Sequence, residues 1–200
     1  MKLILGSQSK SRRAVLESMG YEFEVMSSDI DEKAFRFDDP KKLTLALAHA
    51  KADALLPRIL PAQHSRSARI HEPALLITAD QVIFYNGSIR EKPADEKEAR
   101  AFLRSYGAYP IETIAAVVVT NTATKERREG VDVARVWLTP LAESLIDVLI
   151  AEGETLSLAG GFTLRNPLLK PYIEKIEGEF ESIIGLPKKL TERLIREIGG

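Results

Sequence analysis

The feature that most constrains the fold is an apolar run that leads through a polar loop into a helical stripe at the start of the chain. Residues 3–5 are continuously apolar, as in a strand buried on both faces. The polar stretch 6–13 reads GSQSKSRR, and a helical stripe from Val15 to Met19 then ends at Gly20. A strand, a loop and a helix in this order predict the first unit of an α/β fold.

The first half of the chain continues this alternation. Residues 21–27 alternate like a strand, and a helical stripe that begins at Pro40 ends where an irregular segment starts. That segment, at about 57–73, mixes Pro, Ser, Arg and His, and we expect an exposed loop. The apolar run 74–78 predicts another buried strand, and Asn86-Gly87 between apolar runs predicts a tight hairpin.

The second half of the chain pairs long strands. The β-like runs 111–121 and 131–138 are joined by a polar link, which suggests an antiparallel pair. Further helices are predicted to open at Asp95, Pro140 and Pro187. The class is therefore α/β with a mixed sheet, and we expect two lobes with a cleft between them.

Composition excludes several classes of function. The 200 residues carry 28 Lys and Arg against 29 Asp and Glu, a net charge of −1, which argues against a broad nucleic-acid or membrane-surface binder. Without cysteine there is neither a disulfide framework nor a thiolate zinc site, as suits a reducing compartment. No apolar stretch has the length of a membrane span, and the first residues are too short for a signal peptide. We expect a cytoplasmic protein with no membrane or nucleic-acid partner; a homodimer is compatible with the sequence.

The polar loop 6–13 has two interpretations. The first amides of a helix favour anions, Ser7 and Ser9 add hydroxyls, and Arg12 and Arg13 add guanidinium groups that match phosphate oxygens. Alternatively, a serine caps the helix and the arginines are solvated. The glycine spacing of a P-loop is missing.

Carboxylates and an amide elsewhere are candidates for chemistry. Asp80 follows the buried run 74–78, where open α/β sheets present ligand-binding groups, and it is suited to hold a divalent metal or activate a water. The alternative is a turn aspartate bonded to its own backbone. Gln81 is suited to contact a ligand edge. Asp31 and Glu32 are either metal ligands or a solvated acidic pair.

Two lysines complete the candidates. Lys51 lies four residues from both Leu47 and Leu55, at the margin of the apolar stripe, so it either reaches inward or extends to water. Lys92, which precedes Pro93, has the pattern of an exposed turn residue when taken alone.

Several stretches together resemble one family. They fall in the order and spacing of the Maf (septum formation inhibitor) proteins, which are nucleoside triphosphate pyrophosphatases, and the match runs over nearly the whole chain. The resemblance implies one domain over residues 1–200, with a two-lobed mixed α/β fold and a central cleft similar to that of the inosine triphosphate pyrophosphatases. The matching stretches are LILGSQSKSRRAVLESMGYEFEVMSSDIDEK, LALAHAKADAL, LLITADQVIFYNGSIREKP, EARAFLRSYG, AGGF and IIGLP.

The resemblance also implies an activity and roles for the candidates. It implies hydrolysis of a nucleoside triphosphate to the monophosphate and pyrophosphate, dependent on Mg²⁺ or Mn²⁺, in a housecleaning enzyme that removes unwanted nucleotides. The physics agrees, because lysines, arginine and a metal neutralise a triphosphate, and Asp80 is the best candidate base for an attacking water. By position, Ser7 and Arg12 match the family's phosphate-binding pair, Glu32 and Asp80 its acidic pair and metal ligands, and Lys51 and Lys92 its phosphate lysines.

Two residues depart from the commoner family pattern and bear on base choice. Ser11 replaces an arginine of the pyrimidine-selective type, and Gln81 stands where that type often has threonine. These differences favour the branch acting on 7-methyl-GTP, although that branch often has tryptophan at the position of Ser11. The UTP, CTP and dTTP class and the 7-methyl-GTP class both stay open.

A second hypothesis is a non-catalytic nucleotide sensor or partner-binding protein in cell-division control. A pure interaction surface has no need of this arrangement of lysines and acidic residues, which favours the enzyme. Nucleotide-induced thermal stabilisation without turnover would favour the sensor.

Overall fold

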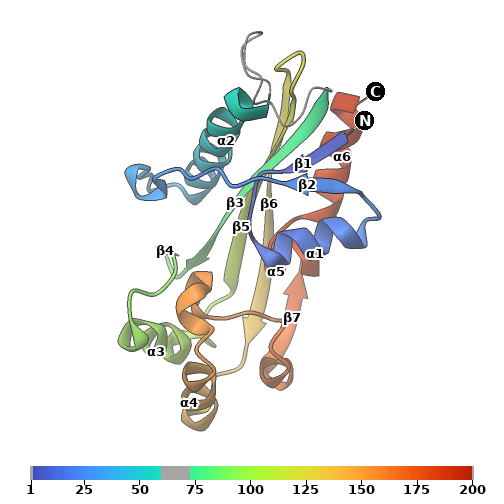
Figure 1. The fold of residues 1–200 in the computed structure, drawn as a ribbon. Helices are drawn as coiled ribbons and strands as arrows, with labels where there is room; N and C mark the ends of the chain where they lie inside the picture. Colours follow the sequence, from blue (N-terminus) through green and yellow to red (C-terminus); the bar gives the residue numbers. More distant parts are fainter. Residues whose placement is uncertain (1, 60–72, 200) are drawn as a thin grey trace. The chain divides into compact units, whose positions relative to one another are not determined.

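A seven-stranded mixed sheet with helices around it organises residues 2–59 and 73–199, the part of the chain that the computed structural model describes (Figure 1). The strand order is β2-β1-β3-β5-β6-β7, and β4 pairs with β3. This mixed α/β architecture confirms the predicted fold class. The strands are β1 Lys2–Leu5, β2 Phe23–Val25, β3 Ala74–Tyr85, β4 Ser88–Arg90, β5 Ile111–Asn121, β6 Arg127–Leu138 and β7 Ile173–Glu177.

Helices connect these strands. The α-helices are α1 Lys10–Ser18, α2 Pro40–Ile59, α3 Glu96–Ser105, α4 Glu143–Ala151, α5 Phe180–Ile184 and α6 Lys188–Gly199. Short 3₁₀ helices are η1 Glu32–Ala34, η2 Thr155–Ser157, η3 Ala159–Gly161 and η4 Pro167–Tyr172.

The chain divides into two compact units, each built from separate segments. The first unit comprises Met1–Asp80, Ala115–Asp132 and Gly185–Gly200, and the second comprises Gln81–Ile114 and Val133–Ile184. The strands β3, β5 and β6 each contribute residues to both units. Along β3 the boundary falls directly after Asp80. The expected arrangement of two lobes around a cleft within one domain stays a prediction.

The core of the first unit lies between its strands and helices. β1 pairs in parallel with β2 on one side and β3 on the other, with Leu3 opposite both Phe23 and Leu75. Ile4 and Leu76 share one buried cluster with residues of α2, whereas a Cβ built on Gly199 of α6 lies 3.7 Å from Leu75. Neighbouring residues of a strand face opposite sides, so α2 covers one face and α6 the other, as Figure 1 shows.

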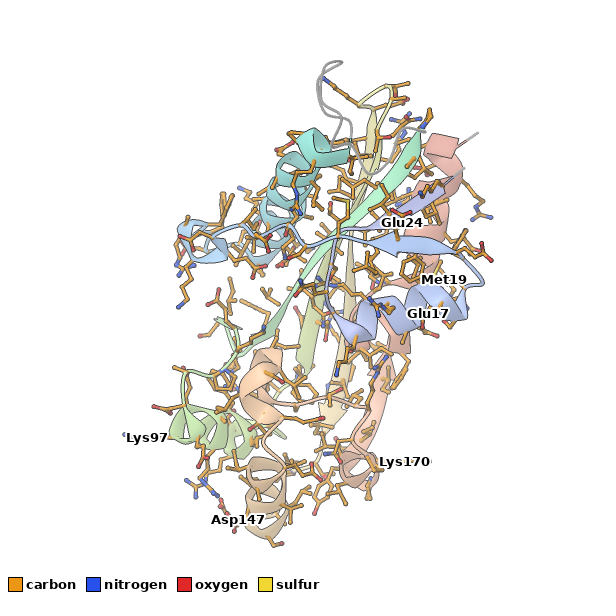
Figure 2. The ribbon with its side chains drawn as sticks, viewed as in Figure 1. Glu17, Met19, Glu24, Lys97, Asp147 and Lys170 are labelled. Atoms are coloured by element: carbon orange, nitrogen blue, oxygen red, sulfur yellow. The ribbon has the colours of Figure 1, made fainter. Side chains whose placement is uncertain are left out.

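The second unit has its own core. Its largest cluster joins α3, β6, α4 and the segment after η3 through Leu103, Val136, Leu149 and Phe162. On its surface Arg100 donates to Asp147 at 2.6 Å, and Figure 2 shows Asp147 on α4, pointing away from the ribbon. The unit therefore has a closed apolar interior and a charged exterior.

The strand that carries Asp80 differs from its prediction. The sequence placed Asp80 after the end of a strand, but β3 continues to Tyr85, so Asp80 lies inside it. Sheet pairing accounts for the longer strand, because β3 has β5 as its neighbour on one side, and on the other side β1 pairs up to Ile77; β4 pairs from Ile83 onward. The Asn86-Gly87 hairpin is confirmed, with φ of 47° and 79° at its two residues.

The end of α2 also differs from its prediction. The helix was expected to end before Pro57, but it continues through Pro57 to Ile59. Leu55 and Ile59 are fully buried one turn apart, and their burial stabilises the last turn despite the amide that proline lacks. The predicted loop therefore does not begin at residue 57, and residues 60–72 lie outside the described part of the chain.

Two further boundaries moved. β6 begins at Arg127 rather than 131, and the strand includes the half-buried residues Arg127 and Arg128, whose charge masked it in the sequence pattern. The helix predicted from Pro140 begins at Glu143, after the N-cap residue Ala142. Both differences are within a few residues, where capping and pairing decide the ends of elements.

Gly6 leaves no room for a side chain where β1 enters the loop. A Cβ at Gly6 would lie 2.7 Å from Leu55 Cδ1 and 2.7 Å from Thr78 Cγ2. Thr78 is fixed because its hydroxyl donates to the carbonyl of Ala48 at 2.8 Å.

We expect Gly6→Ala to lower the free energy of unfolding by about 1–3 kcal/mol through overpacking, measured by urea denaturation. The control Gln8→Ala, at an exposed position, should stay within about 0.5 kcal/mol of the parent; equal midpoints for Gly6→Ala and the parent would contradict the prediction.

Candidate active site

The loop between β1 and α1 is organised by two serines. Ser9 is the N-cap of α1, and its hydroxyl accepts from the amide of Arg12 at 3.3 Å. The hydroxyl of Ser7 accepts from the amide of Ser9 at 3.2 Å. Ser9 thus caps the helix, as the alternative interpretation of this loop predicted. The first amides of α1, at Lys10 and Ser11, have no hydrogen-bond acceptor within the helix itself. Those amides keep the anion preference of a helix N-terminus.

Arg12 is held in one orientation. Its Nε donates to the carbonyl of Gly185 at 3.1 Å, and one terminal nitrogen donates to the hydroxyl of Ser7 at 3.4 Å. Burial lowers the pKa of the guanidinium, while Asp80 and Glu32 act in the opposite direction, and the group stays charged. Arg13 is exposed, and it is not among the charges that act on Asp80.

Lys51 reaches inward from α2. Ala48 and Ala52 beside it are fully buried, and the lysine itself is 5% exposed. Its ammonium donates to Asp80 Oδ1 at 2.6 Å and lies 2.7 Å from Glu32 Oε1. The lysine therefore links a carboxylate on β3 to one on η1, which the sequence left open.

Asp80 is a buried carboxyl beside two cations. Its side chain is 8% exposed, and burial raises the pKa of the carboxyl above its ordinary value of 3.8. The charges of Lys51 and Arg12 oppose that rise. Burial with neighbouring cations is an environment in which a carboxylate serves as a proton acceptor or a metal ligand.

Glu32 and Asp31 have separate tasks. The side chain of Asp31 accepts from the amide of Lys33 at 3.1 Å and so caps η1. Glu32 is 56% exposed and meets Lys51 with one oxygen. Of the two acidic residues that the sequence offered, only Glu32 joins Asp80 around the lysine.

The donors present fit a divalent metal that binds together with phosphates. Within residues 2–59 and 73–199 no three His, Cys, Asp or Glu side chains gather as a complete protein site. Glu32 and Asp80 supply two hard carboxylates, and Mg²⁺ is commonly held by one or two carboxylates with substrate phosphates and waters completing its shell. The residues therefore suit a metal that a nucleotide brings with it.

Gln81 and Lys92 belong to the second unit. The side-chain amide of Gln81 donates to the carbonyl of Ile183 at 3.1 Å, so its nitrogen is engaged and its oxygen remains as an acceptor. Lys92 follows β4 and its side chain is exposed. That Gln81 and Lys92 belong to the same site as Arg12, Lys51 and Asp80 stays a prediction.

Gly185 is a site residue that the sequence analysis did not single out. Its carbonyl orients Arg12, and its φ is 145°. A Cβ there would lie 3.2 Å from the Cβ of half-buried Ser11. The IIGLP stretch was the only signal, because nothing in a periodic pattern links residues 173 positions apart.

The chain is similar to known proteins over nearly its whole length. The family model described as Maf-like protein matches residues 2–198. A 7-methyl-GTP pyrophosphatase of Dictyostelium discoideum is 44% identical over 196 residues, which are 98% of this chain and 96% of that protein. A nucleoside triphosphate pyrophosphatase of Salinispora tropica is 34% identical, covering 99% of this chain and 84% of the relative. A dTTP/UTP pyrophosphatase of Deinococcus radiodurans is 33% identical, covering 99% and 93%.

Among the described residues, no helix is long and apolar enough to cross a membrane. The family model spans residues 2–198, and the three relatives align with 98% or 99% of this chain. On these matches, the chain belongs to the Maf-like protein family.

Proposed function

We propose that this protein hydrolyses a nucleoside triphosphate to the monophosphate and pyrophosphate. The observation that carries the proposal is the buried Lys51–Asp80 pair, which Glu32 and Arg12 flank beside the N-terminus of α1. The names of the relatives, which all describe nucleotide pyrophosphatases, support the same activity. A cytoplasmic location, a homodimer and the absence of nucleic-acid binding stay predictions.

Phosphate binding is the first task of these residues. The fixed guanidinium of Arg12, the hydroxyl of Ser7 and the first amides of α1 offer donors to phosphate oxygens. Lys51 adds an ammonium at the same place, and we propose that Lys92 adds another from the second unit. These cations offset the charge that increases on the phosphates as the reaction proceeds.

Proton transfer is the task of Asp80. In the proposed reaction a water attacks the α-phosphorus, the bond from that phosphorus to the bridging oxygen of the β-phosphate breaks, and pyrophosphate leaves. Asp80 accepts the proton that the attacking water loses. Burial raises the pKa of the carboxyl and so makes the carboxylate a stronger base than a solvated aspartate, while the charge of Lys51 opposes that rise and favours the ionised form.

A divalent cation is part of the proposal. Glu32 and Asp80 would hold Mg²⁺ or Mn²⁺ together with phosphate oxygens. The metal would neutralise charge on the phosphates and lower the pKa of a bound water. Lys51 lies between the two carboxylates, and its ammonium has three donors, of which one would be available to a phosphate.

The base is assigned by class. We propose a modified or pyrimidine nucleotide, of the 7-methyl-GTP or the UTP, CTP and dTTP class; the relatives' names include 7-methyl-GTP and dTTP/UTP. Ser11 and Gln81 are the proposed specificity residues. Ser11 is small and half-buried near Gly185, so it leaves space where a larger residue would not.

Pyrophosphate release tests the proposal directly. We expect turnover of one class in a panel of UTP, CTP, dTTP, 5-methyl-UTP, pseudo-UTP and 7-methyl-GTP with Mg²⁺ or Mn²⁺, and its loss with a chelator. Nucleotide-dependent thermal stabilisation without release on any substrate would favour the sensor hypothesis and overturn the enzyme. Release that persists in the chelator would overturn the metal requirement alone.

A further inference from the structure

Arg90, at the end of β4, lies against three aromatic rings of the second unit. Its guanidinium carbon is 4.3 Å from the ring centre of Tyr85, 4.7 Å from that of Phe102 and 5.0 Å from that of Tyr106. A guanidinium within about 6 Å of a ring centre is attracted to the face of the ring. Arg90 is half-buried, and contacts with three rings hold its guanidinium in place.

Hydrogen bonds fix the same guanidinium to the end of α3. One terminal nitrogen donates to the hydroxyl of Ser105 at 2.8 Å and to the carbonyl of Phe102 at 3.3 Å. Tyr85 donates its own hydroxyl to the carbonyl of Ser105 at 2.5 Å. The end of β4 is thereby attached to the last turn of α3 through directional bonds as well as stacking.

The contacts then return to the chain next to Arg90. Tyr106, one of the three rings, donates its hydroxyl to the carbonyl of Gly160 at 2.7 Å, and the amide of Gly160 donates to the carbonyl of Glu91 at 3.0 Å. Burial raises the pKa of Tyr106 to about 12, so the hydroxyl keeps the proton that it donates. Gly160 has a φ of 67°, and a Cβ there would lie 2.7 Å from the Tyr106 oxygen, so the position requires glycine. Arg90, Tyr106 and Gly160 are called the Lys92 clamp below.

The residue that this clamp brackets is Lys92. Its preceding peptide is held through the carbonyl of Glu91, and the following residue, Pro93, is buried near Gly161. A residue before proline is restricted to extended backbone conformations. The backbone of Lys92 is therefore fixed on both sides while its side chain remains exposed to meet a ligand.

We infer that Arg90 is a positioning residue for Lys92. This inference rests on the proposed function, in which the ammonium of Lys92 binds the triphosphate. A long, exposed lysine loses conformational entropy when it binds an anion, and a fixed backbone limits that loss to the side chain. The clamp thus determines where the ammonium of Lys92 can reach, without itself touching the nucleotide.

Amide exchange tests the clamp without reference to activity. In Arg90→Met and in Tyr106→Phe, which keeps the ring and removes only the hydroxyl, the amide of Gly160 should exchange about tenfold faster than in the parent. The control Arg104→Met removes an exposed arginine of α3 that pairs with Glu143, and it should leave that amide unchanged. Unchanged protection of Gly160 in both clamp variants would overturn the inference, whatever the enzyme does.

A double-mutant cycle tests the link to Lys92. Arg90→Met should lower kcat/KM about tenfold when Lys92 is present, mainly through KM, and have little further effect in a Lys92→Ala background. Equal losses in both backgrounds, or full activity of Lys92→Ala, would overturn the positioning role. Absence of turnover in the parent enzyme would instead overturn the proposed function, and the exchange result would still decide the clamp.

Discussion

Asp80→Asn is expected to lose about 10³-fold in kcat for pyrophosphate release while the protein stays folded. Asparagine has nearly the shape of aspartate but cannot take a proton from water at neutral pH. Its carbonyl oxygen can still accept from Lys51, which also keeps Glu32 as a partner. Because burial disfavours the ionised carboxylate, the neutral amide should cost little stability, so the melting temperature should change by only a few degrees.

The matched control is Asp53→Asn on the exposed side of α2. Asp53 pairs with Arg127 at the surface and has no part in the proposed chemistry. We expect its kcat to equal that of the parent. Nucleotide binding to Asp80→Asn, measured by calorimetry with substrate, should persist and so separate lost chemistry from lost binding. Turnover of Asp80→Asn within tenfold of the parent would remove Asp80 from the role of base.

The elements that the sequence predicted well are those that local rules determine. The loop and helix after β1 follow from a cap and an apolar stripe, and Ser9 is that cap. The helix predicted at Asp95 begins there because Asp95 accepts from the amide of Glu98 at 2.8 Å. Such signals involve residues three or four positions apart, so they are visible in the sequence.

The long strand β3 was outside the reach of local rules. Asp80 and Gln81 interrupt an apolar pattern, and a polar pair between apolar runs ordinarily marks a turn. The strand pairs with β1 up to Ile77 and with β4 from Ile83, and β5 lies on its other side in the sheet. Sheet pairing is a long-range property, and no window around Asp80 contains it.

The site was predictable in its residue types but not in its contacts. Four-residue spacing put Lys51 at the margin of an apolar stripe, where burial and exposure were equally open. Only the fold decides between them, because Asp80 lies opposite in β3 and stabilises an inward ammonium. The carbonyl of Gly185 that orients Arg12 comes from a distant segment, and the rings of Phe102 and Tyr106 meet Arg90 from the helix α3 and its end, so no spacing rule connects them.

Lys51→Met is the second large effect that we expect, and its mark is a changed pH dependence. Methionine keeps the length of the side chain but removes the charge that most strongly opposes the elevated pKa of Asp80. The pKa of Asp80 should therefore rise further, and the acid limb of kcat/KM should move to higher pH. At neutral pH we expect about 10²-fold lower turnover, because both a phosphate contact and part of the ionised base are lost.

The same substitution should change stability with a defined sign. A carboxyl whose pKa is raised on folding stabilises the folded state fully below its ordinary value of 3.8, and that contribution is lost as the pH rises through the folded pKa. Since Lys51→Met raises the folded pKa further, its loss in melting temperature relative to the parent should be small in acid and grow as the pH rises. Removal of one partner of a buried pair costs about 3–5 kcal/mol when the other stays charged, which sets the upper limit.

Thermal unfolding and kcat/KM measured across the same pH range check both expectations for Lys51→Met. Lys42→Met is the control, since Lys42 is an exposed lysine of the same helix. Its acid limb and its melting curve should follow those of the parent. An acid limb in Lys51→Met that coincides with the parent's would mean that Asp80 does not set the pH dependence. A stability loss that is constant with pH would place the effect of Lys51 in packing, rather than in the charge that lowers the pKa of Asp80.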